Sequence, residues 1–208
     1  IADPRDNMKI FEWLPEFVFD DKGNCCQYFY KKENDLGFDR SLLHNKNRFQ
    51  NNQITYTNTY LEKIVYGNKT PYKNFADAFP GASDYLFQTV LDYGPRHEND
   101  PVDLINEWDF RPDAFSDYKA GFEIRTTRLC KRVLLFHHFD ELPGGVALVK
   151  SVNFTYDQLA DKNFAFLQSV TSFGYIKKSD GNYTSKHFPP TAFEYQQLEW
   201  SKTVQEIA

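Results

Sequence analysis

Few cysteines and no long apolar run are the first features of this 208-residue sequence. Two of the three cysteines, Cys25 and Cys26, are adjacent, and the third is Cys130. A disulfide framework usually has an even number of cysteines at wider spacing, so we expect three free thiols. No apolar stretch approaches the roughly 20 residues that a membrane-spanning helix requires. These absences argue against a disulfide-stabilised miniprotein and against direct membrane insertion.

Targeting signals and excess positive charge are absent as well. The N-terminal residues IADPRDN are polar, show no signal-peptide pattern and do not begin with methionine, so we expect a piece of a longer protein. Lys and Arg number 24 against 29 Asp and Glu, which gives a net charge of −5 and no global field to attract nucleic acid. The sequence contains no G-x-S-x-G, P-loop or dinucleotide-binding fingerprint, and we expect no cofactor.

Aromatic residues are abundant, with 20 Phe and 13 Tyr, a bias that suits the half-buried surfaces of β-sheets. Apolar residues recur at every second position in several runs. Phe87 and Leu91 share a predicted face with Thr89, and Leu148 shares one with Val152. This alternation is typical of strands rather than of long amphipathic helices.

Turn chemistry separates these runs. DDKGN (20–24) and SDGN (179–182) predict hairpins, because Gly and Asn accept a positive φ at low cost. Long loops are expected over 42–53 and 95–117, and short helices near 74–79, 157–164 and 199–208. We predict one all-β domain over residues 1–208, with mostly antiparallel sheets of long hairpins and roughly eight to ten strands. The sheets would form a sandwich or part of a curved shell.

The stretch AGFEIRTTRLCKRVLLFHHF, residues 120–139, contains four basic residues, a cysteine and a His-His pair. We interpret it as one long strand with a bulge at Thr126 and Thr127. His137 and His138 would then point to opposite faces, one packed and one exposed, and could not readily bind one metal together. Cys130 would lie mid-strand, away from the loops and helix termini where thiolates are usually activated, so we expect a small core residue.

The four basic residues of this stretch are Arg125, Arg128, Lys131 and Arg132. In a strand, Arg128 and Arg132 share one face while the other two take the opposite face. Aromatic residues do not alternate with them, as a platform for stacking nucleic-acid bases would require. We therefore expect no nucleic-acid binding, and we assign no catalytic, cofactor-binding or metal-binding residue to the chain.

Several long segments resemble one protein family in sequence and in order. They are IADP (1–4), FEWLPEFVFDDKGNCCQYFYKKEN (11–34), YLEKIVYGNKTPY (60–72), FQTVLDYG (87–94), RPDAFSDYKAGFEIRTTRLCKRVLLFHHF (111–139), LVKSVNFTY (148–156), FLQSVTSFGY (166–175) and FPPTAFEY (188–195). Together they resemble the SpvB family, which comprises the N-terminal regions of the Salmonella virulence plasmid B protein and of the B component of bacterial insecticidal toxin complexes. The loop around 45–53 and the tail after Gln196 do not take part in the resemblance.

The resemblance implies a non-catalytic structural or delivery module of a secreted bacterial toxin. The module would form part of a β-rich shell, next to a β-propeller and Rhs/YD-repeat strips, that encloses or carries a toxic effector domain. Its partners would be those parts of the same toxin chain and the other components of the complex. In the virulence-plasmid protein the enzymatic part is a separate C-terminal ADP-ribosyltransferase domain. The present chain would be the C-terminal half of a larger SpvB-type domain, located outside the bacterium although no signal peptide is visible.

Two other functions stay open at this point. One is a carbohydrate-binding β domain, for which we expect exposed aromatic residues such as Trp108, Trp200 and the many tyrosines to stack on sugar rings. Cys130 with His137 or His138 would be the basis of an enzyme fragment. The resemblance also implies that edge strands are left unpaired in a piece of a wall, so self-association of the isolated chain is expected.

Overall fold

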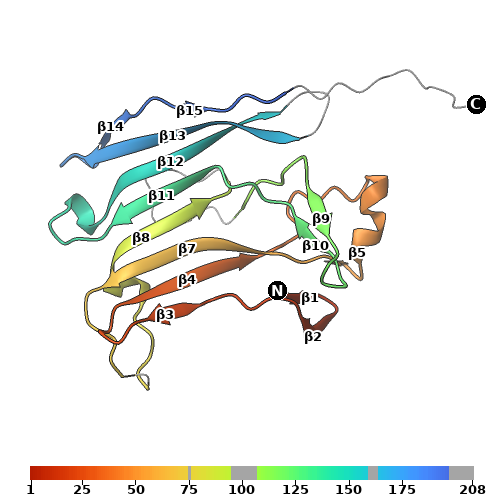
Figure 1. Ribbon diagram of the computed structural model, residues 1–208, viewed down its shortest axis with the longest axis horizontal. Helices are drawn as coiled ribbons and strands as arrows, with labels where there is room; N and C mark the ends of the chain where they lie inside the picture. The colour runs from red at the N-terminus through yellow and green to blue at the C-terminus, as the bar shows by residue number, and fades with distance from the viewer. Residues whose placement is uncertain (75, 95–106, 159–163, 197–208) are drawn as a thin grey trace, which may run out of the picture.

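One large antiparallel sheet organises the protein (Figure 1). The structure, a computed structural model, describes residues 1–74, 76–94, 107–158 and 164–196. The sheet has nine strands in the order β14-β13-β12-β11-β8-β7-β4-β3, with β15 also paired to β13. Their bounds are β3 Phe17–Phe19, β4 Cys25–Lys32, β7 Thr59–Asn68, β8 Tyr85–Asp92, β11 Arg132–His137, β12 Ala147–Gln158, β13 Ala165–Lys177, β14 Tyr183–His187 and β15 Thr191–Ala192. The predicted all-β, antiparallel fold is confirmed.

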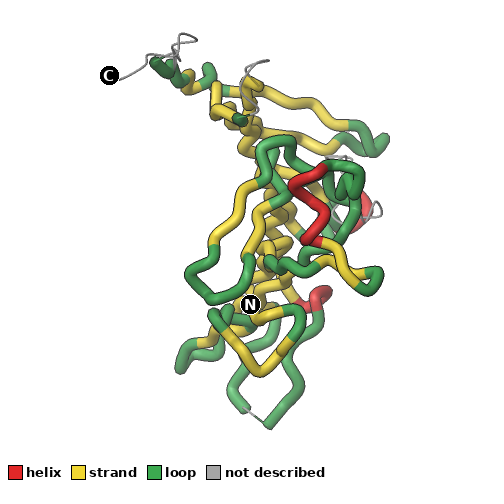
Figure 2. The backbone as a smooth tube through the Cα atoms, turned by 90° about the vertical axis from the view of Figure 1, so that its right-hand side faces the viewer, coloured by secondary structure: helices red, strands yellow, loops and turns green. Residues whose placement is uncertain are grey.

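Three small hairpins and three short 3-10 helices complete the described structure. The hairpins are β1–β2 (Ala2–Asp3 and Asp6–Ile10), β5–β6 (Phe49–Gln50 and Gln53–Ile54) and β9–β10 (Phe115–Asp117 and Ile124–Thr126). The helices are η1 (Leu43–Arg48), η2 (Ala82–Asp84) and η3 (Pro143–Gly145). All three hairpins lie at the same end of the main sheet, which Figure 2 views from that end.

The two hairpin turns predicted from sequence are present. Gly23 has φ +88° between β3 and β4, and Gly181 has φ +85° between β13 and β14. The first turn is held from outside by Asn68, whose side-chain amide donates to the carbonyls of Gly23 at 2.9 Å and Thr70 at 2.7 Å. The side-chain oxygen of Asn68 accepts the backbone N–H of Cys25 at 2.9 Å. One side chain thus satisfies three backbone groups.

The middle of the sheet buries a compact apolar cluster. Val90, Leu134, Phe136 and Leu148, from β8, β11 and β12, are at most 1% exposed. β-Branched, aliphatic and aromatic side chains at alternate positions are what a half-covered antiparallel sheet buries. Deep burial therefore falls where the predicted strand pattern is strongest.

The predicted face of β12 is wrong at its start. Leu135 pairs with Lys150 while Phe136 pairs with Leu148, so the register shifts there. The bulge inserts one residue and inverts the alternation. Leu148 consequently shares the buried face with Ser151, which is 1% exposed, and not with Val152.

The central stretch is two strands and not one. β10 ends at Thr126 and pairs with β9 in a separate hairpin, whereas β11 begins at Arg132 in the main sheet. Residues 127–131 form the irregular connection. The predicted bulge at Thr126 and Thr127 is therefore a complete change of sheet, because the chain leaves one hairpin to enter another sheet.

Other local predictions also need correction. The described residues near 74–79 form a turn instead of a helix, and Asp157 and Gln158 belong to β12. The predicted loop 42–53 contains η1 and the β5–β6 hairpin, and the predicted loop 95–117 ends in β9. Residues 95–106, 159–163 and the predicted C-terminal helix lie outside the described residues. Over the residues that are described, no helix has the length and apolarity to cross a membrane.

Candidate functional site

Charged side chains are buried most deeply at the end of the sheet that carries the small hairpins. Glu33 directly follows β4, and Arg128 lies in the connection between β10 and β11. The two side chains form an ion pair and are only 1% and 2% exposed, respectively. Charges at this depth are tolerated only when their hydrogen-bonding capacity is satisfied.

Both carboxylate oxygens of Glu33 are occupied. Oε1 accepts from Nε of Arg128 at 3.2 Å and from the backbone N–H of Asn34 at 3.0 Å. Oε2 accepts from the hydroxyl groups of Tyr60 at 2.6 Å and Thr127 at 2.5 Å. We call these five residues the Glu33 cluster. It ties the end of β4 to β7 and to the connection after β10.

The guanidinium of Arg128 is equally well satisfied. It donates to the side-chain oxygen of Asn34 at 2.7 Å, to the carbonyl of Leu36 at 3.1 Å and to the carbonyl of Trp108. It also lies 5.7 Å from the ring centroid of Phe110. The planar five-donor geometry of Arg suits such a multiple junction, which Lys could not reproduce.

Tyr60 acts in this cluster as a permanent donor. Burial and the neighbouring carboxylate of Glu33 raise the pKa of Tyr60 to about 12. Its hydroxyl group accepts the backbone N–H of Thr127 at 2.9 Å while it donates to Glu33. The tyrosine is therefore protonated at neutral pH and serves as a structural bridge.

A second ion-pair group attaches η1 to the β9–β10 hairpin. Glu123 accepts from Nε of Arg48 at 2.7 Å and from the hydroxyl of Ser116 at 2.6 Å. Arg125 donates to the same serine hydroxyl at 2.8 Å. Burial alone would raise the pKa of Glu123, but the bonds from Ser116 and Arg48 outweigh it and hold that pKa below its usual value.

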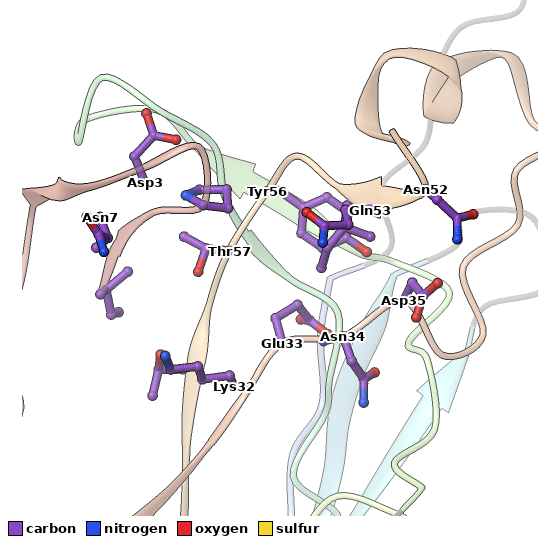
Figure 3. A pocket seen from close by; sticks show the side chains of 15 residues that line it. Asp3, Asn7, Lys32, Glu33, Asn34, Asp35, Asn52, Gln53, Tyr56 and Thr57 are labelled. Atoms are coloured by element: carbon purple, nitrogen blue, oxygen red, sulfur yellow. Dashed lines mark hydrogen bonds between the residues drawn. The ribbon is translucent and has the colours of Figure 1, made fainter. Parts of the chain in front are cut away.

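A cavity of about 570 Å³ lies beside the Glu33 cluster (Figure 3). It is bounded by the β1–β2 hairpin, the end of β4 and the β5–β6 hairpin. Its lining includes Asp3, Lys32, Asn34, Gln53 and Tyr56. The lining residues come from three stretches of the chain, within 1–7, 32–35 and 52–59, so the cavity depends on how the hairpins pack on the sheet.

The carboxylates around the cavity already have partners inside the chain. Asp3 accepts the backbone N–H of Arg5 at 2.9 Å, which lowers the pKa of Asp3. Asp35 pairs with Arg40 at 3.1 Å, and Glu33 is enclosed in its own cluster. General acid–base catalysis needs a titratable group that can reach the substrate. Each of the three carboxylates among the described lining residues is instead paired within the chain.

The His-His pair makes two unrelated contacts. The ring of His137 packs at 5.0 Å from Phe87, whereas Nε2 of His138 lies 3.0 Å from the side-chain oxygen of Gln88. Burial lowers the pKa of His138. Both side chains are half-buried, so the expectation of one exposed histidine is wrong. Among the described residues no three His, Cys, Asp or Glu side chains are grouped to hold a metal ion.

Cys130 lies in the irregular connection 127–131 and not in mid-strand as predicted. It packs against the buried cluster of Tyr60, Tyr93 and Trp108. Burial raises the pKa of the Cys130 thiol to about 11, so it is protonated at neutral pH. Its Sγ donates to the carbonyl of Arg132 at 3.5 Å. A thiol in this state is a poor nucleophile.

The four basic residues are all committed within the chain. Arg125 and Arg128 are buried in the two ion-pair groups described above. Lys131 pairs with Asp109, and Nε of Arg132 donates to Asp92 at 2.5 Å. They hold chain segments together instead of lining a basic groove.

Trp108 does not offer a surface for sugar stacking. It is 6% exposed and stacks on Tyr93 at 4.5 Å. The expectation that Trp108 is an exposed aromatic is therefore wrong, because the ring belongs to the core beneath the hairpins. Trp200 lies outside the described residues.

Sequence patterns did not identify the Glu33 cluster. Glu33 lies in the strongly charged run KKEN (31–34). Such a run at the end of a strand predicts solvent-exposed side chains. The partners of Glu33, which are Tyr60, Thr127 and Arg128, lie 27 to 95 residues away. The isolated Glu gives no local signal of burial, and only the tertiary fold brings the partners to it.

Comparisons with known proteins agree with the architecture. The sequence model of the SpvB family, described as Salmonella virulence plasmid 65kDa B protein, matches residues 1–139. A curated relative, Mono(ADP-ribosyl)transferase SpvB of Salmonella typhimurium, is 36% identical over 175 residues, which cover 76% of this chain. The chain spans only 27% of the length of that relative.

Two solved structures are similar over most of the chain. The crystal structure of TcdB2-TccC3-Cdc42 matches with a TM-score of 0.74 and 30% identity, covering 96% of this chain and 9% of that chain. The N-terminal domain of the effector protein SpvB from Salmonella typhimurium strain LT2 matches with a TM-score of 0.70 and 33% identity, covering 84% of this chain and 54% of that chain. Sequence and fold together show that the chain belongs to the SpvB family.

Proposed function

We propose that the chain is a non-catalytic structural module of a secreted bacterial toxin. It forms part of a β-rich shell that encloses or carries a toxic effector domain. The observation that carries the proposal is the match of 96% of this chain to 9% of a TcdB2-TccC3 chain. The matched segment is a small part of that toxin chain, which supports a module surrounded by other parts of the same polypeptide.

The physical character of the fold supports this role. A wall element needs a wide, stiff sheet, and the nine-stranded sheet supplies one. Its buried charged groups form ion pairs within the chain, as in the Glu33 cluster, and do not converge on an accessible site. The partners we propose are the β-propeller and the Rhs/YD-repeat strips of the parent toxin, together with the other components of the complex.

The chain is also proposed to be the C-terminal half of a larger SpvB-type domain. The coverage of 54% of the solved SpvB N-terminal domain by 84% of this chain supports the size of that piece. The transferase activity in the name of the curated relative is a property of a protein of which this chain spans 27%. We assign that activity to a part of such proteins outside the region matched here.

A transfer assay tests the non-catalytic part of the proposal. The 208-residue chain is incubated with labelled NAD⁺ and a host-cell lysate, with full-length SpvB as the positive control. We expect label on lysate proteins with the control and none with this chain. Label transferred by this chain, and lost on boiling it beforehand, would overturn the assignment.

The surrounding gene tests the shell role. Sequencing the DNA on both sides of the coding region should reveal propeller-like and YD repeats, and cryo-electron microscopy of the encoded protein should place this sheet in the shell wall. An ADP-ribosyltransferase segment directly downstream would make the chain a carrier of a single effector. A stop codon shortly after Ala208 with no toxin genes nearby would contradict both versions.

A further inference from the structure

A row of aromatic side chains crosses three neighbouring strands of the main sheet, β7, β8 and β11 (Figure 1). Tyr66 pairs with Phe87, and Phe87 pairs with His137, so the three side chains point to the same face. The ring of Phe87 stacks on Tyr66 at 5.2 Å and meets the imidazole of His137 edge-on at 5.0 Å. Phe139 adds a further edge contact to Phe87 at 5.8 Å. We call these four residues the aromatic patch.

The same face stays apolar in the rows beside the patch. Directly paired residues form a next row of Ile64, Thr89 and Leu135 and a row after it of Leu91, Val133 and Val152. All six of these side chains are half-buried. The opposite face of the same strands is covered, since Val65, Val90 and Phe136 are at most 1% exposed. The two faces of the sheet are therefore both apolar, but only one of them is fully buried.

β11 shows this most clearly. Its residues Val133, Leu134, Leu135 and Phe136 are apolar without interruption. An antiparallel strand with one face in water alternates between apolar and polar side chains, whereas a continuous apolar run is typical of a strand covered on both faces. Leu134 and Phe136 are fully buried, but Val133 and Leu135 are only half-buried. The composition of the strand thus indicates a second layer over the half-buried face.

We propose that another segment of the parent polypeptide packs on the aromatic patch and on the apolar rows beside it. The inference rests on the part of the proposed function that embeds this module in a longer polypeptide. The match of this chain to 9% of a TcdB2-TccC3 chain supports such surroundings. Apolar rows on a sheet pack well against a second sheet, because the side chains of two inner faces interdigitate. The occupant is an apolar β segment outside residues 1–208 of this chain.

Two polar groups within the patch define what this segment must supply. The imidazole of His137 and the hydroxyl of Tyr66 make no hydrogen bond with other described residues. Burying a polar group costs free energy unless it is hydrogen-bonded. The segment therefore places hydroxyl, amide or backbone groups opposite these two side chains, and apolar side chains opposite Phe87.

Charge narrows the choice further. Lys150 pairs with Leu135 at the border of the apolar rows, is exposed, and has no ion-pair partner among the described residues. An acidic side chain at the corresponding border of the segment would find Lys150 as its partner. A charge placed directly over Leu135 would be buried without one, which is strongly unfavourable. A segment with a neutral interior and an acidic border fits this face.

Photo-crosslinking in the full-length protein encoded by the surrounding gene identifies the occupant. The photoreactive amino acid p-benzoylphenylalanine replaces Tyr66 or, as a control, Tyr118, which is 59% exposed between β9 and β10. We expect position 66 to crosslink within one polypeptide to a peptide outside residues 1–208, and position 118 not to reach that peptide. The inference is overturned if position 66 crosslinks only within residues 1–208, to a second copy, to a separate component, or not at all.

A charge insertion tests the covering by stability. Thr89→Lys places an ammonium among the apolar rows. In the isolated chain the long side chain reaches water, so we expect a nearly unchanged melting temperature. In the full-length protein the same side chain lies under the second layer, and the melting temperature should fall by several degrees.

Thr155→Lys is the matched control, because it makes the same change at an exposed position of β12 on the opposite face. It should leave the melting temperatures of the isolated chain and of the full-length protein unchanged. Equal losses for the two variants in the full-length protein, or no loss for Thr89→Lys, would contradict a covering of this face.

The outcomes separate this inference from the proposed function. If cryo-electron microscopy places the sheet in a shell wall while position 66 does not crosslink as expected, the covering of this face is wrong and the shell role stands. If the expected crosslink forms in a full-length protein that builds no shell, the shell role is wrong and the covering stands.

Discussion

The middle of the sheet and its hairpin end are held together by different physics. In the middle, Val90, Leu134 and Phe136 contact one another through apolar surface, which is non-directional and tolerates small shifts. At the hairpin end, Glu33 and Arg128 depend on each other and on several fixed hydrogen bonds. The loss of one partner leaves the other charge buried and unpaired. We therefore expect the hairpin end to be the more sensitive region to single substitutions.

Removing Arg128 should have the largest effect. Arg128→Met leaves the Glu33 carboxylate buried without its counter-charge, and we expect a loss of about 3–5 kcal/mol in the free energy of unfolding. Urea denaturation followed by tryptophan fluorescence measures it. Lys119→Met breaks an exposed pair with Asp117, which solvent screens, and should leave the free energy of unfolding nearly unchanged. If the free energy of unfolding falls by the same small amount in both variants, the Glu33 cluster does not stabilise the hairpin end of the sheet.

Truncating the apolar middle should come next. Leu134→Ala removes a fully buried side chain, and we expect a loss of about 3 kcal/mol from lost burial and the cavity left behind. The matched control is Ile176→Ala in β13, whose side chain is 72% exposed and should change stability by less than about 0.5 kcal/mol. If Leu134→Ala lowered the free energy of unfolding more than Arg128→Met, the apolar middle would be the more sensitive region.

Hydroxyl removal gives a finer comparison between two buried tyrosines. Tyr60→Phe deprives the Glu33 carboxylate and the backbone N–H of Thr127 of a partner, and we expect about 2 kcal/mol of destabilisation. Tyr93→Phe removes a single bond to the neutral carbonyl of Leu61 and should cost about 1 kcal/mol. Equal losses in thermal or urea unfolding would mean that the charged partner adds nothing.

Acid sensitivity should be the smallest of these effects. The pKa of Glu123 is lower in the folded chain than the value near 4.3 of an unfolded chain. The unfolded state therefore binds protons first as pH falls, so the stability from this group is complete above about pH 5 and is lost as pH falls through the folded pKa. We expect Glu123→Gln to reduce the fall in the urea midpoint between pH 6 and pH 3. An unchanged fall would assign the acid sensitivity to other carboxyl groups.

Local patterns were enough for the parts of the fold that repeat locally. The alternation of Phe87, Thr89 and Leu91 predicts β8, and the Gly-containing turns predict the two hairpins. The register shift beside Leu148 could not be predicted, because a bulge inserts a residue without disturbing the apolar content. The chain passes from the β9–β10 hairpin to the main sheet at Thr127. The residues on both sides favour strands, so the sequence does not predict this change.

The candidate site was harder to predict than the fold. Arg128 reads as surface charge by composition, and its burial is decided by Glu33, which precedes it by 95 residues. Cys130 and His138 attract interest by residue type, yet their environments hold them uncharged. Residue type suggests chemistry, but the dielectric and the partners supplied by tertiary contacts determine it.

The turn that Asn68 fastens limits how the protein can be produced. Asn68-Lys-Thr is an acceptor sequence for N-glycosylation, and a glycan would replace one of the two amide hydrogens that bind the carbonyls of Gly23 and Thr70. Expression through a eukaryotic secretory pathway would therefore place a sugar where the β3–β4 turn needs a hydrogen bond. Production in a bacterial cytosol leaves this amide intact, and the three cysteines, all free in the fold, suit a reducing compartment.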